Sequence, residues 1–284
     1  MTSIVNQQFQ AERSLYNLRD AEVINCRFAG PEDGESPLKE ARNTLVSGCT
    51  FALRYPFWHD RDTRIVDCLL EEPTRAPLWY CSGLDIHNTQ IYSVKSLREC
   101  SGITIKDSKF HSEEFMWRCK DVVIDNAEVH SAYAFFQCEN MEIRGLNLKG
   151  KYSFQYTRNI TIRDSVLDTK DAFWHAENIT VIDSVVKGEY LSWYSDRVTF
   201  INCKIIGTQP LCYDSNLVLK NCTMEGCDFS FEYSHVDADV VGHILSVKNP
   251  GSGTILCDSC GEVIMEDAVY PANGSVVLRG NQHQ

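Results

Sequence analysis

The chain has 284 residues, of which 43% are hydrophobic, so it can bury a sizeable core in one or two domains. Its 8 prolines and 16 glycines exclude a collagen-like or disordered chain. A formal net charge of −12 repels nucleic acid and anionic membranes, and no stretch approaches the ~20 apolar residues of a membrane span, so we expect neither partner.

The N-terminal segment and the cysteines indicate the compartment. Residues 1–10 have neither the basic start nor the apolar stretch of a secretion signal. Most of the 13 cysteines fall at repeating positions, where they act as small buried residues in a reducing environment. We therefore expect a cytoplasmic protein.

A repeat of mostly 19 residues begins after residues 1–11, which we expect to cap the fold. Each repeat opens with apolar residues that alternate over three positions, as in a strand with one buried face. The third position forms a column, with steps of 23, 19 and 21 residues and then of 19 as far as Leu219: Val23, Val46, Ile65, Ile86, Ile105, Ile124, Ile143, Ile162, Val181, Phe200 and Leu219.

An Asn, Asp or Gly stands two positions after this column, for example Asn88, Asp107 and Gly145. These residue types adopt a left-handed backbone conformation at the least cost, so we expect a sharp one-residue corner there. A small residue and then an apolar one follow, which predicts a second short strand.

A third segment completes each repeat, and the same 23-, 19- and 21-residue steps recur in it. An apolar residue there is followed by a large or charged one, in the pairs Leu38-Lys39, Phe57-Trp58, Leu78-Trp79, Leu97-Arg98, Met116-Trp117 and Phe173-Trp174. Since an unpaired charge is costly inside a narrow coil, the second member of each pair is expected to point outward.

These elements predict an all-β fold, a right-handed parallel β-helix of about twelve coils with three short strands per coil. Leucine-rich repeats need a Leu/Asn signature that is absent, and helical repeats are longer. The right hand follows from the chirality of parallel crossovers. We expect one domain over residues 1–284, with residues 265–284 as a second cap.

The chain resembles the pectin-lyase-like superfamily of parallel β-helices through repeats such as Asn159-Ile-Thr-Ile-Arg-Asp-Ser165 and through its corner residues. The motifs Glu35-Ser-Pro-Leu-Lys-Glu40, Tyr55-Pro-Phe-Trp-His59 and Arg75-Ala-Pro-Leu-Trp-Tyr80 look like those of an uncharacterised bacterial family within it. The resemblance implies a fold and, by analogy with the superfamily's polysaccharide-degrading enzymes, a groove on one parallel sheet.

The outward column of the third segment contains all five tryptophans, and exposed aromatic rings stack on sugar rings. We therefore predict a carbohydrate site there; packing under loops or against a partner chain is the alternative. The expected substrate-binding residues are Lys39, Trp58, Trp79, Arg75, Arg98 and Trp117.

Charged residues near the same face are the candidates for catalysis. Glycoside hydrolysis needs two carboxyl groups ~5–9.5 Å apart, which side chains one or two coils apart can supply, so Glu35 and Glu40 are candidates. Arg54 suits a uronide carboxylate, and His59 suits proton transfer. An ordinary solvated charge is the alternative at each position.

Departures from the characterised enzymes weaken a specific assignment. No pair of aspartates followed by Gly-His-Gly occurs, so polygalacturonase residues have no counterpart. Arg54-Tyr-Pro56 begins like the Arg-x-Pro-x-x-Arg of pectate lyases, but His59 replaces the last arginine.

We expect no metal and no cofactor. His111 and His130 should stack on adjacent coils but offer only two ligands. The prediction is a carbohydrate-binding or carbohydrate-active β-helix. The alternative is a non-catalytic scaffold whose aromatic face binds a protein partner or forms a homodimer.

Overall fold

The computed structural model describes residues 2–30 and 34–281. Within them, every regular element is a β-strand except one short 3-10 helix, η1 (Arg279–Asn281). The chain divides into two compact units, Met1–Asn147 and Leu148–Gln284, which are described in turn. The expectation of a single domain stays a prediction.

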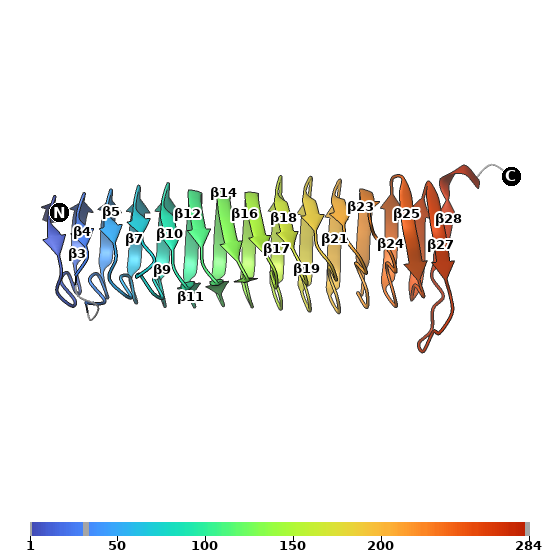
Figure 1. Cartoon of the computed structure of the whole chain (residues 1–284), viewed down its shortest axis with the longest axis horizontal. Coiled ribbons are helices and arrows are strands. Elements are labelled where there is room, and N and C mark those ends of the chain that lie inside the picture. The colour runs from blue at the N-terminus through green and yellow to red at the C-terminus, as the bar shows by residue number, and fades with distance from the viewer. Residues whose placement is uncertain (1, 31–33, 282–284) are drawn as a thin grey trace. The chain divides into compact units, whose positions relative to one another are not determined.

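The first unit is a stack of coils in which the strands of successive coils lie side by side (Figure 1). Its last strand, β16, ends in the second unit. The strands are β1 (Thr2–Val5), β2 (Gln8–Phe9), β3 (Arg19–Ile24), β4 (Arg27–Phe28), β5 (Arg42–Ser47), β6 (Thr50–Phe51), β7 (Arg61–Val66), β8 (Leu69–Leu70), β9 (Ser82–His87), β10 (Gln90–Tyr92), β11 (Lys95–Arg98), β12 (Ser101–His111), β13 (Glu114–Trp117), β14 (Lys120–Ser131), β15 (Tyr133–Ala134) and β16 (Glu139–Gly150).

The second unit has the same organisation. Its strands are β17 (Arg158–Arg163), β18 (Val166–Thr169), β19 (Glu177–Ile182), β20 (Val185–Lys187), β21 (Asp196–Ile201), β22 (Lys204–Ile206), β23 (Leu217–Glu225), β24 (His235–Val240), β25 (His243–Lys248), β26 (Ser252–Cys257), β27 (Ser259–Ile264) and β28 (Ser275–Leu278).

Pairing between coils is parallel and keeps the predicted column in register. In the first unit Val46 pairs with Ile65, and Ile65 with Ile86. In the second unit Val181 pairs with Phe200 in the same way. These side chains are buried, so each coil contributes a layer to a continuous core. The fold is a right-handed parallel β-helix, as predicted, with about 14 coils in all.

The expected corners are present, because the Asn, Asp and Gly residues there have positive φ angles: Asn88 44°, Asp107 49° and Gly145 65°. Side chains of neighbouring corners hydrogen-bond to one another. The amide of Asn126 donates to Asp107 at 2.6 Å, for example. These bonds satisfy polar groups that line the edge of the stack.

The third segment is a regular strand only in β11, β13 and β15 among the described residues; elsewhere isolated bridges such as Trp58–Trp79 join it to its neighbours. Leu78 (φ 60°) and Tyr80 (φ 59°) adopt the left-handed conformation on either side of Trp79. Bulky residues rarely do this, since it costs about 1–2 kcal/mol each. Complete burial of Leu78 offsets part of that cost.

Both expected caps contain strands that belong to coils. β1 pairs with β3, and Phe9 of β2 stacks on Phe28 at 5.0 Å. At the other end β28 pairs with β26, and Arg279 forms ion pairs of 2.7 Å with Asp239 and Asp258. Met1 and residues 282–284 lie outside the described residues. The capping role of both segments stays a prediction.

Candidate functional site

The outward column of the first unit brings five predicted substrate-binding residues into line. Trp58, Trp79 and Arg98 pair on successive coils, and Arg98 pairs with Trp117. These side chains are half-buried and point outward, while their neighbours Leu38, Phe57, Leu78, Leu97 and Met116 are buried in the core. The prediction that the charged and tryptophan residues of this column point outward is thus confirmed.

The rings of this column stack on one another. Trp58 and Trp79 are 5.2 Å apart and nearly parallel, at 7°. The guanidinium of Arg98 lies between Trp79, at 4.7 Å, and Trp117, at 4.9 Å. The Lys39 ammonium lies 5.8 Å from the Trp58 ring. The ring faces are therefore covered by neighbours, and mainly ring edges are left for a ligand.

Each indole N–H in this unit is also used internally. Trp58 donates to the carbonyl of Ala76 at 2.7 Å, Trp79 to that of Lys95 at 2.8 Å, and Trp117 to that of Tyr133 at 2.9 Å. These bonds hold each ring across the gap between two coils. The column consequently stabilises the stack, whatever else it does.

The predicted catalytic residues do not form one cluster. Glu35 pairs with Arg54 on the next coil at 3.7 Å, and Glu40 pairs with Arg42 at 3.0 Å. His59 stacks on Tyr80, with 5.1 Å between ring centroids. Their catalytic roles stay predictions.

Arg75, the remaining predicted substrate-binding residue, is exposed. It lies outside the column, and its role likewise stays a prediction.

The thiol and imidazole side chains are the remaining candidates for chemistry in the described residues. All 13 cysteines are free, and burial raises the pKa of the Cys81 thiol well above its usual value. His111 and His130 do lie together, 5.8 Å apart. No group of three or more His, Cys, Asp or Glu side chains in residues 2–30 and 34–281 could hold a metal ion. The same residues contain no helix long and apolar enough to cross a membrane.

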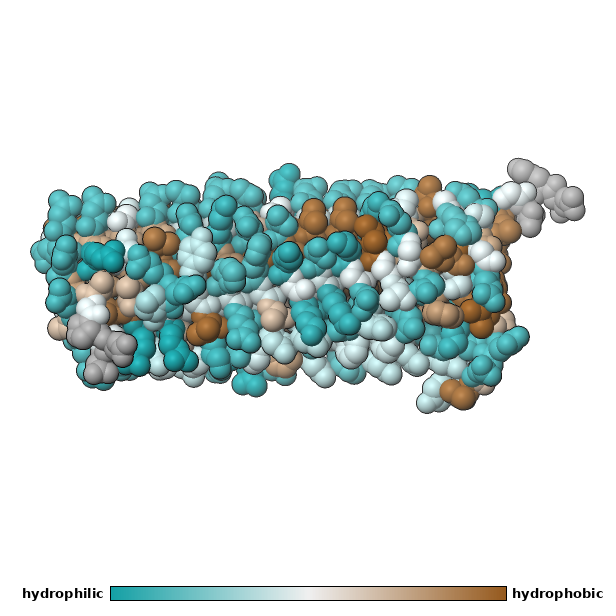
Figure 2. Space-filling view, in the orientation of Figure 1, coloured by the Kyte–Doolittle hydropathy of each residue, from teal (hydrophilic) through white to brown (hydrophobic). Residues whose placement is uncertain are grey.

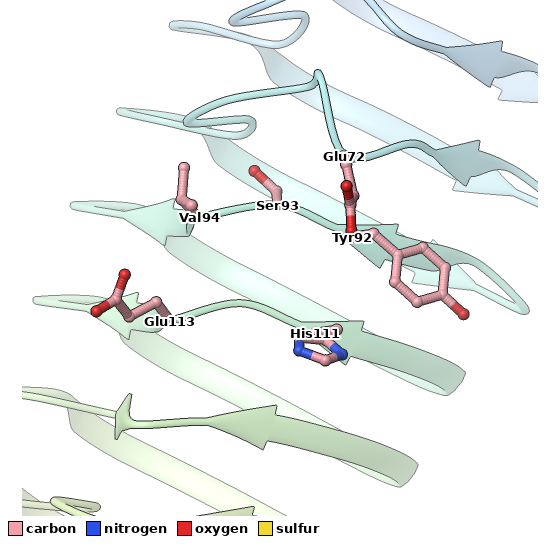
Figure 3. Close-up of a pocket in the computed structure, with 6 residues that line it drawn as sticks. All are labelled: Glu72, Tyr92, Ser93, Val94, His111 and Glu113. Carbon is pink, nitrogen blue, oxygen red and sulfur yellow. The ribbon is translucent and has the colours of Figure 1, made fainter.

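A pocket of about 330 Å³ lies in the first unit, above the connections from β10 to β11 and from β12 to β13 (Figure 3). It opens where one coil is two residues longer than the standard repeat. The lining residues come from three successive coils: Glu72, Tyr92, Ser93, Val94, His111 and Glu113.

A larger pocket of about 640 Å³ lies in the second unit, beside the loop between β27 and β28. Four tyrosines dominate its wall, and no Asp, Glu, Lys or Arg belongs to the described residues that line it. The lining residues are Tyr194, Tyr213, Tyr233, His235, Gly251, Ser252, Tyr270, Pro271 and Asn273. We call this site the tyrosine pocket.

Two contacts shape the tyrosine pocket. Tyr194 and Tyr213 stack at 4.7 Å, whereas Tyr270 meets Tyr233 edge-on at 5.2 Å. The backbone N–H of Val269 donates to the Tyr233 hydroxyl at 3.0 Å, which fixes the loop. Tyr270 is 62% exposed, so part of its ring is open to a ligand.

The phenol of Tyr213 is held in its protonated form. Desolvation, followed by the charge of Glu232 and the neighbouring Tyr194, raises its pKa to about 12. Its hydroxyl can therefore donate a hydrogen bond to a ligand at neutral pH.

Sequence reasoning missed both pockets, because it looked for function in the regular columns. The sequence signal that could have located the pockets was a departure from the regular 19-residue repeat. One pocket accompanies a 21-residue step, and the other accompanies the non-repeating loop of residues 265–274. Regular coils present flat sheets, whereas an extra loop can form a wall.

The model of a family described as a protein of unknown function, DUF3737, matches residues 2–277. The chain belongs to this family. No curated protein matches the sequence of this DUF3737 member.

Three solved structures share its architecture. PfbA, a surface adhesin of Streptococcus pneumoniae, is 11% identical over 80% of this chain and 73% of its own, with a TM-score of 0.43. The A-module of the mannuronan C-5 epimerase AlgE4 from Azotobacter vinelandii is 9% identical, over 97% of this chain and 90% of its own, with a TM-score of 0.27. The tailspike protein of E. coli bacteriophage HK620, in complex with a hexasaccharide, is 9% identical, over 99% and 72%, with a TM-score of 0.37. These similarities concern the fold and carry no argument about function.

Proposed function

We propose that this protein binds carbohydrate, and that a neutral saccharide occupies the tyrosine pocket. The observation that carries the proposal is a concave site with four tyrosines and no charged Asp, Glu, Lys or Arg in its described lining. Its volume of about 640 Å³ falls within the range of small-molecule sites.

The chemistry of the lining suits a sugar. An aromatic ring accepts the C–H face of a pyranose, and the exposed ring of Tyr270 is available for this contact. The hydroxyls of Tyr213 and Ser252 and the amide of Asn273 offer donors and acceptors for sugar hydroxyls. A uronic acid would find no Lys or Arg among the described lining residues, so a neutral glycan fits best.

The pocket favours binding over hydrolysis. Cleavage of a glycosidic bond ordinarily requires a pair of carboxyl groups on either side of it, and none belongs to the described lining. We therefore propose a binding protein rather than a glycosidase at this site.

The tryptophan column of the first unit fits this role less well. Its faces stack on one another and its N–H groups bond to the backbone, so a sugar would reach only ring edges. On the face shown in Figure 2, hydrophobic side chains form separate patches among hydrophilic ones.

The test is a glycan array of neutral and acidic oligosaccharides, followed by calorimetric titration of the best binder. Tyr270→Ala removes the stacking ring and should weaken binding about tenfold, the equivalent of ~1.4 kcal/mol. Tyr213→Phe removes one hydroxyl and should weaken it about two- to tenfold.

Tyr156→Ala is the matched control, because Tyr156 is a half-exposed tyrosine that stacks on His175 and does not line the pocket. It should bind like the unmodified protein. Trp79→Ala tests the rival site. Loss of binding in Trp79→Ala but not in Tyr270→Ala would contradict the assignment of the saccharide to the tyrosine pocket. Failure of every saccharide to bind would contradict the proposed function.

A further inference from the structure

The loop between β27 and β28 is fastened to the neighbouring coil at both of its ends. Where it begins, the backbone N–H of Asn249 donates to the carbonyl of Ile264 at 2.8 Å, and the Asn249 side-chain amide donates to the carbonyl of Glu266 at 3.0 Å. Where it ends, the N–H groups of Asn273 and Gly274 donate to backbone carbonyls of that coil, both at 2.9 Å. The loop is therefore anchored at Glu266 and at Asn273.

Between these anchors, residues 267–272 are joined to the coils by two contacts with a single side chain, Tyr233. Within residues 2–30 and 34–281, their one hydrogen bond to the coils runs from the N–H of Val269 to the Tyr233 hydroxyl, at 3.0 Å. Tyr270 meets the ring of Tyr233 edge-on, at 5.2 Å and 86°. Val269 is 78% exposed and Tyr270 62%, so burial holds neither side chain in place. A segment with so few buried contacts can open without unfolding the coils around it.

This loop also forms one wall of the tyrosine pocket. Tyr270, Pro271 and Asn273 line the pocket from the loop, whereas the other lining residues belong to coils. Figure 1 shows the connection between β27 and β28 extending beyond the ends of the neighbouring strands. A displacement of residues 267–272 would therefore open the pocket on one side and leave its other wall intact.

We propose that residues 267–272 are a lid on the tyrosine pocket and that Tyr233 is its latch. The structure shows the closed form, in which Val269 and Tyr270 both contact Tyr233. The lid opens when these two contacts break, and the anchored positions Glu266 and Asn273 act as its hinges. The ligand that the lid retains rests on the proposed function, a neutral saccharide, whereas the latch can be measured without any ligand.

The latch is tested by hydrogen exchange of the full chain without ligand, followed by mass spectrometry. Tyr233→Phe keeps the ring and removes the hydroxyl that accepts from Val269, so the Val269 amide should exchange about two- to tenfold faster. Tyr213→Phe is the matched control, because it removes a hydroxyl from the adjoining ring, 5.5 Å away, and it should leave the exchange of Val269 unchanged. Unchanged exchange in Tyr233→Phe, or equal acceleration in both variants, would overturn the proposal.

The effect of the lid on binding is tested by surface plasmon resonance with immobilised maltohexaose, cellohexaose and chitohexaose. A latched lid slows both entry and escape, so Tyr233→Phe should raise the association and the dissociation rate constants together, each about two- to tenfold. Tyr213→Phe should raise the dissociation rate constant alone, because it removes only a contact with the sugar. An unchanged association rate constant in Tyr233→Phe would overturn the lid. If no sugar binds but the difference in hydrogen exchange is observed, the latch is supported and only the proposed function is contradicted.

Discussion

Two buried aspartates should make the stability of this protein depend strongly on pH. Asp60 and Asp214 are 0% and 1% exposed. In each, Oδ1 accepts a backbone hydrogen bond from the preceding coil, from Ala41 at 3.1 Å and from Ser195 at 2.8 Å. In each, Oδ2 has no hydrogen-bond partner among the described residues. An ionised carboxylate in such a position would be very costly.

The neighbouring coils indicate whether the protonated or the ionised form of Asp60 fits this position. Asp60 shares its column with cysteines that donate to buried carbonyls; Cys81 donates to Phe57 at 3.0 Å and Cys100 to Leu78 at 2.9 Å. A protonated carboxyl can donate in the same way, and a carboxylate cannot.

Electrostatics favour the same form. Burial raises the pKa of both aspartates well above the usual value. Near Asp60, the charges of Arg42 and Glu40 act in opposite directions. We infer that both carboxyls are neutral in the folded protein.

The sign of the pH effect follows directly. An unfolded aspartate ionises near pH 3.9, so above that pH the folded chain holds a proton that the unfolded chain has lost. The free energy of unfolding then falls by up to about 1.4 kcal/mol per pH unit for each carboxyl, until the pH reaches the raised pKa. Stability from these groups is thus greatest in acid and is lost as the pH rises.

Asp60→Asn tests this inference, because asparagine keeps the oxygen that accepts from Ala41 and carries a donor at every pH. Urea unfolding followed by circular dichroism between pH 4.5 and 8 should show a shallower pH dependence in the variant than in the unmodified protein. The advantage of the variant should grow by up to about 1.4 kcal/mol per pH unit. The double variant Asp60→Asn/Asp214→Asn should remove the contributions of both carboxyls to the pH dependence of the free energy of unfolding.

Asp107→Asn is the control, since it makes the same change at an exposed corner. Its pH dependence should match that of the unmodified protein. If Asp60→Asn lowers stability by the same amount at every pH, the carboxyl does not change its protonation on unfolding, and the reasoning is refuted.

Three further predictions concern the stack itself. Trp79→Phe removes an indole hydrogen bond and should lower the free energy of unfolding by about 1 kcal/mol in urea titration. Arg98→Met breaks two cation–π contacts and the ion pair with Glu114, and should cost about 1–3 kcal/mol, measured in the same way. Gly207→Ala places a methyl group 2.1 Å from the carbonyl oxygen of Gly188 at a φ of 131°, so we expect a loss of at least ~3 kcal/mol. Gly226→Ala, with no atom near its added methyl group, should cost only about 1 kcal/mol; equal losses would contradict the steric argument.

The fold was largely predictable, because a constant coil length permits only one register. Residues 19 apart must lie on adjacent coils, and Ile86, Ile105 and Ile124 are accordingly paired and buried. The outward direction of Trp79 and Arg98 was predictable from the cost of burying an unpaired charge in their column. The rotamers of the tryptophan side chains were not predictable. Spacing alone does not indicate that the indoles lie flat against one another instead of presenting their faces to solvent.

The tyrosine pocket could not be predicted from the sequence, for a different reason. Tyr194 and Tyr213 follow the repeat, but Tyr270 belongs to a loop whose position depends on contacts with residues far away in the sequence. The buried aspartates were also missed, although Asp60 stands 21 residues before Cys81, the same step as in the other columns. Polar residues that replace a buried thiol are best found by extending each column to both ends.

The most direct test of the carbohydrate proposal is a crystal structure of the protein with the best-binding neutral oligosaccharide. The account predicts sugar density in the tyrosine pocket, with one ring against Tyr270 and hydroxyls near Tyr213 and Asn273. Density along Trp58 and Trp79 with an empty tyrosine pocket would contradict it.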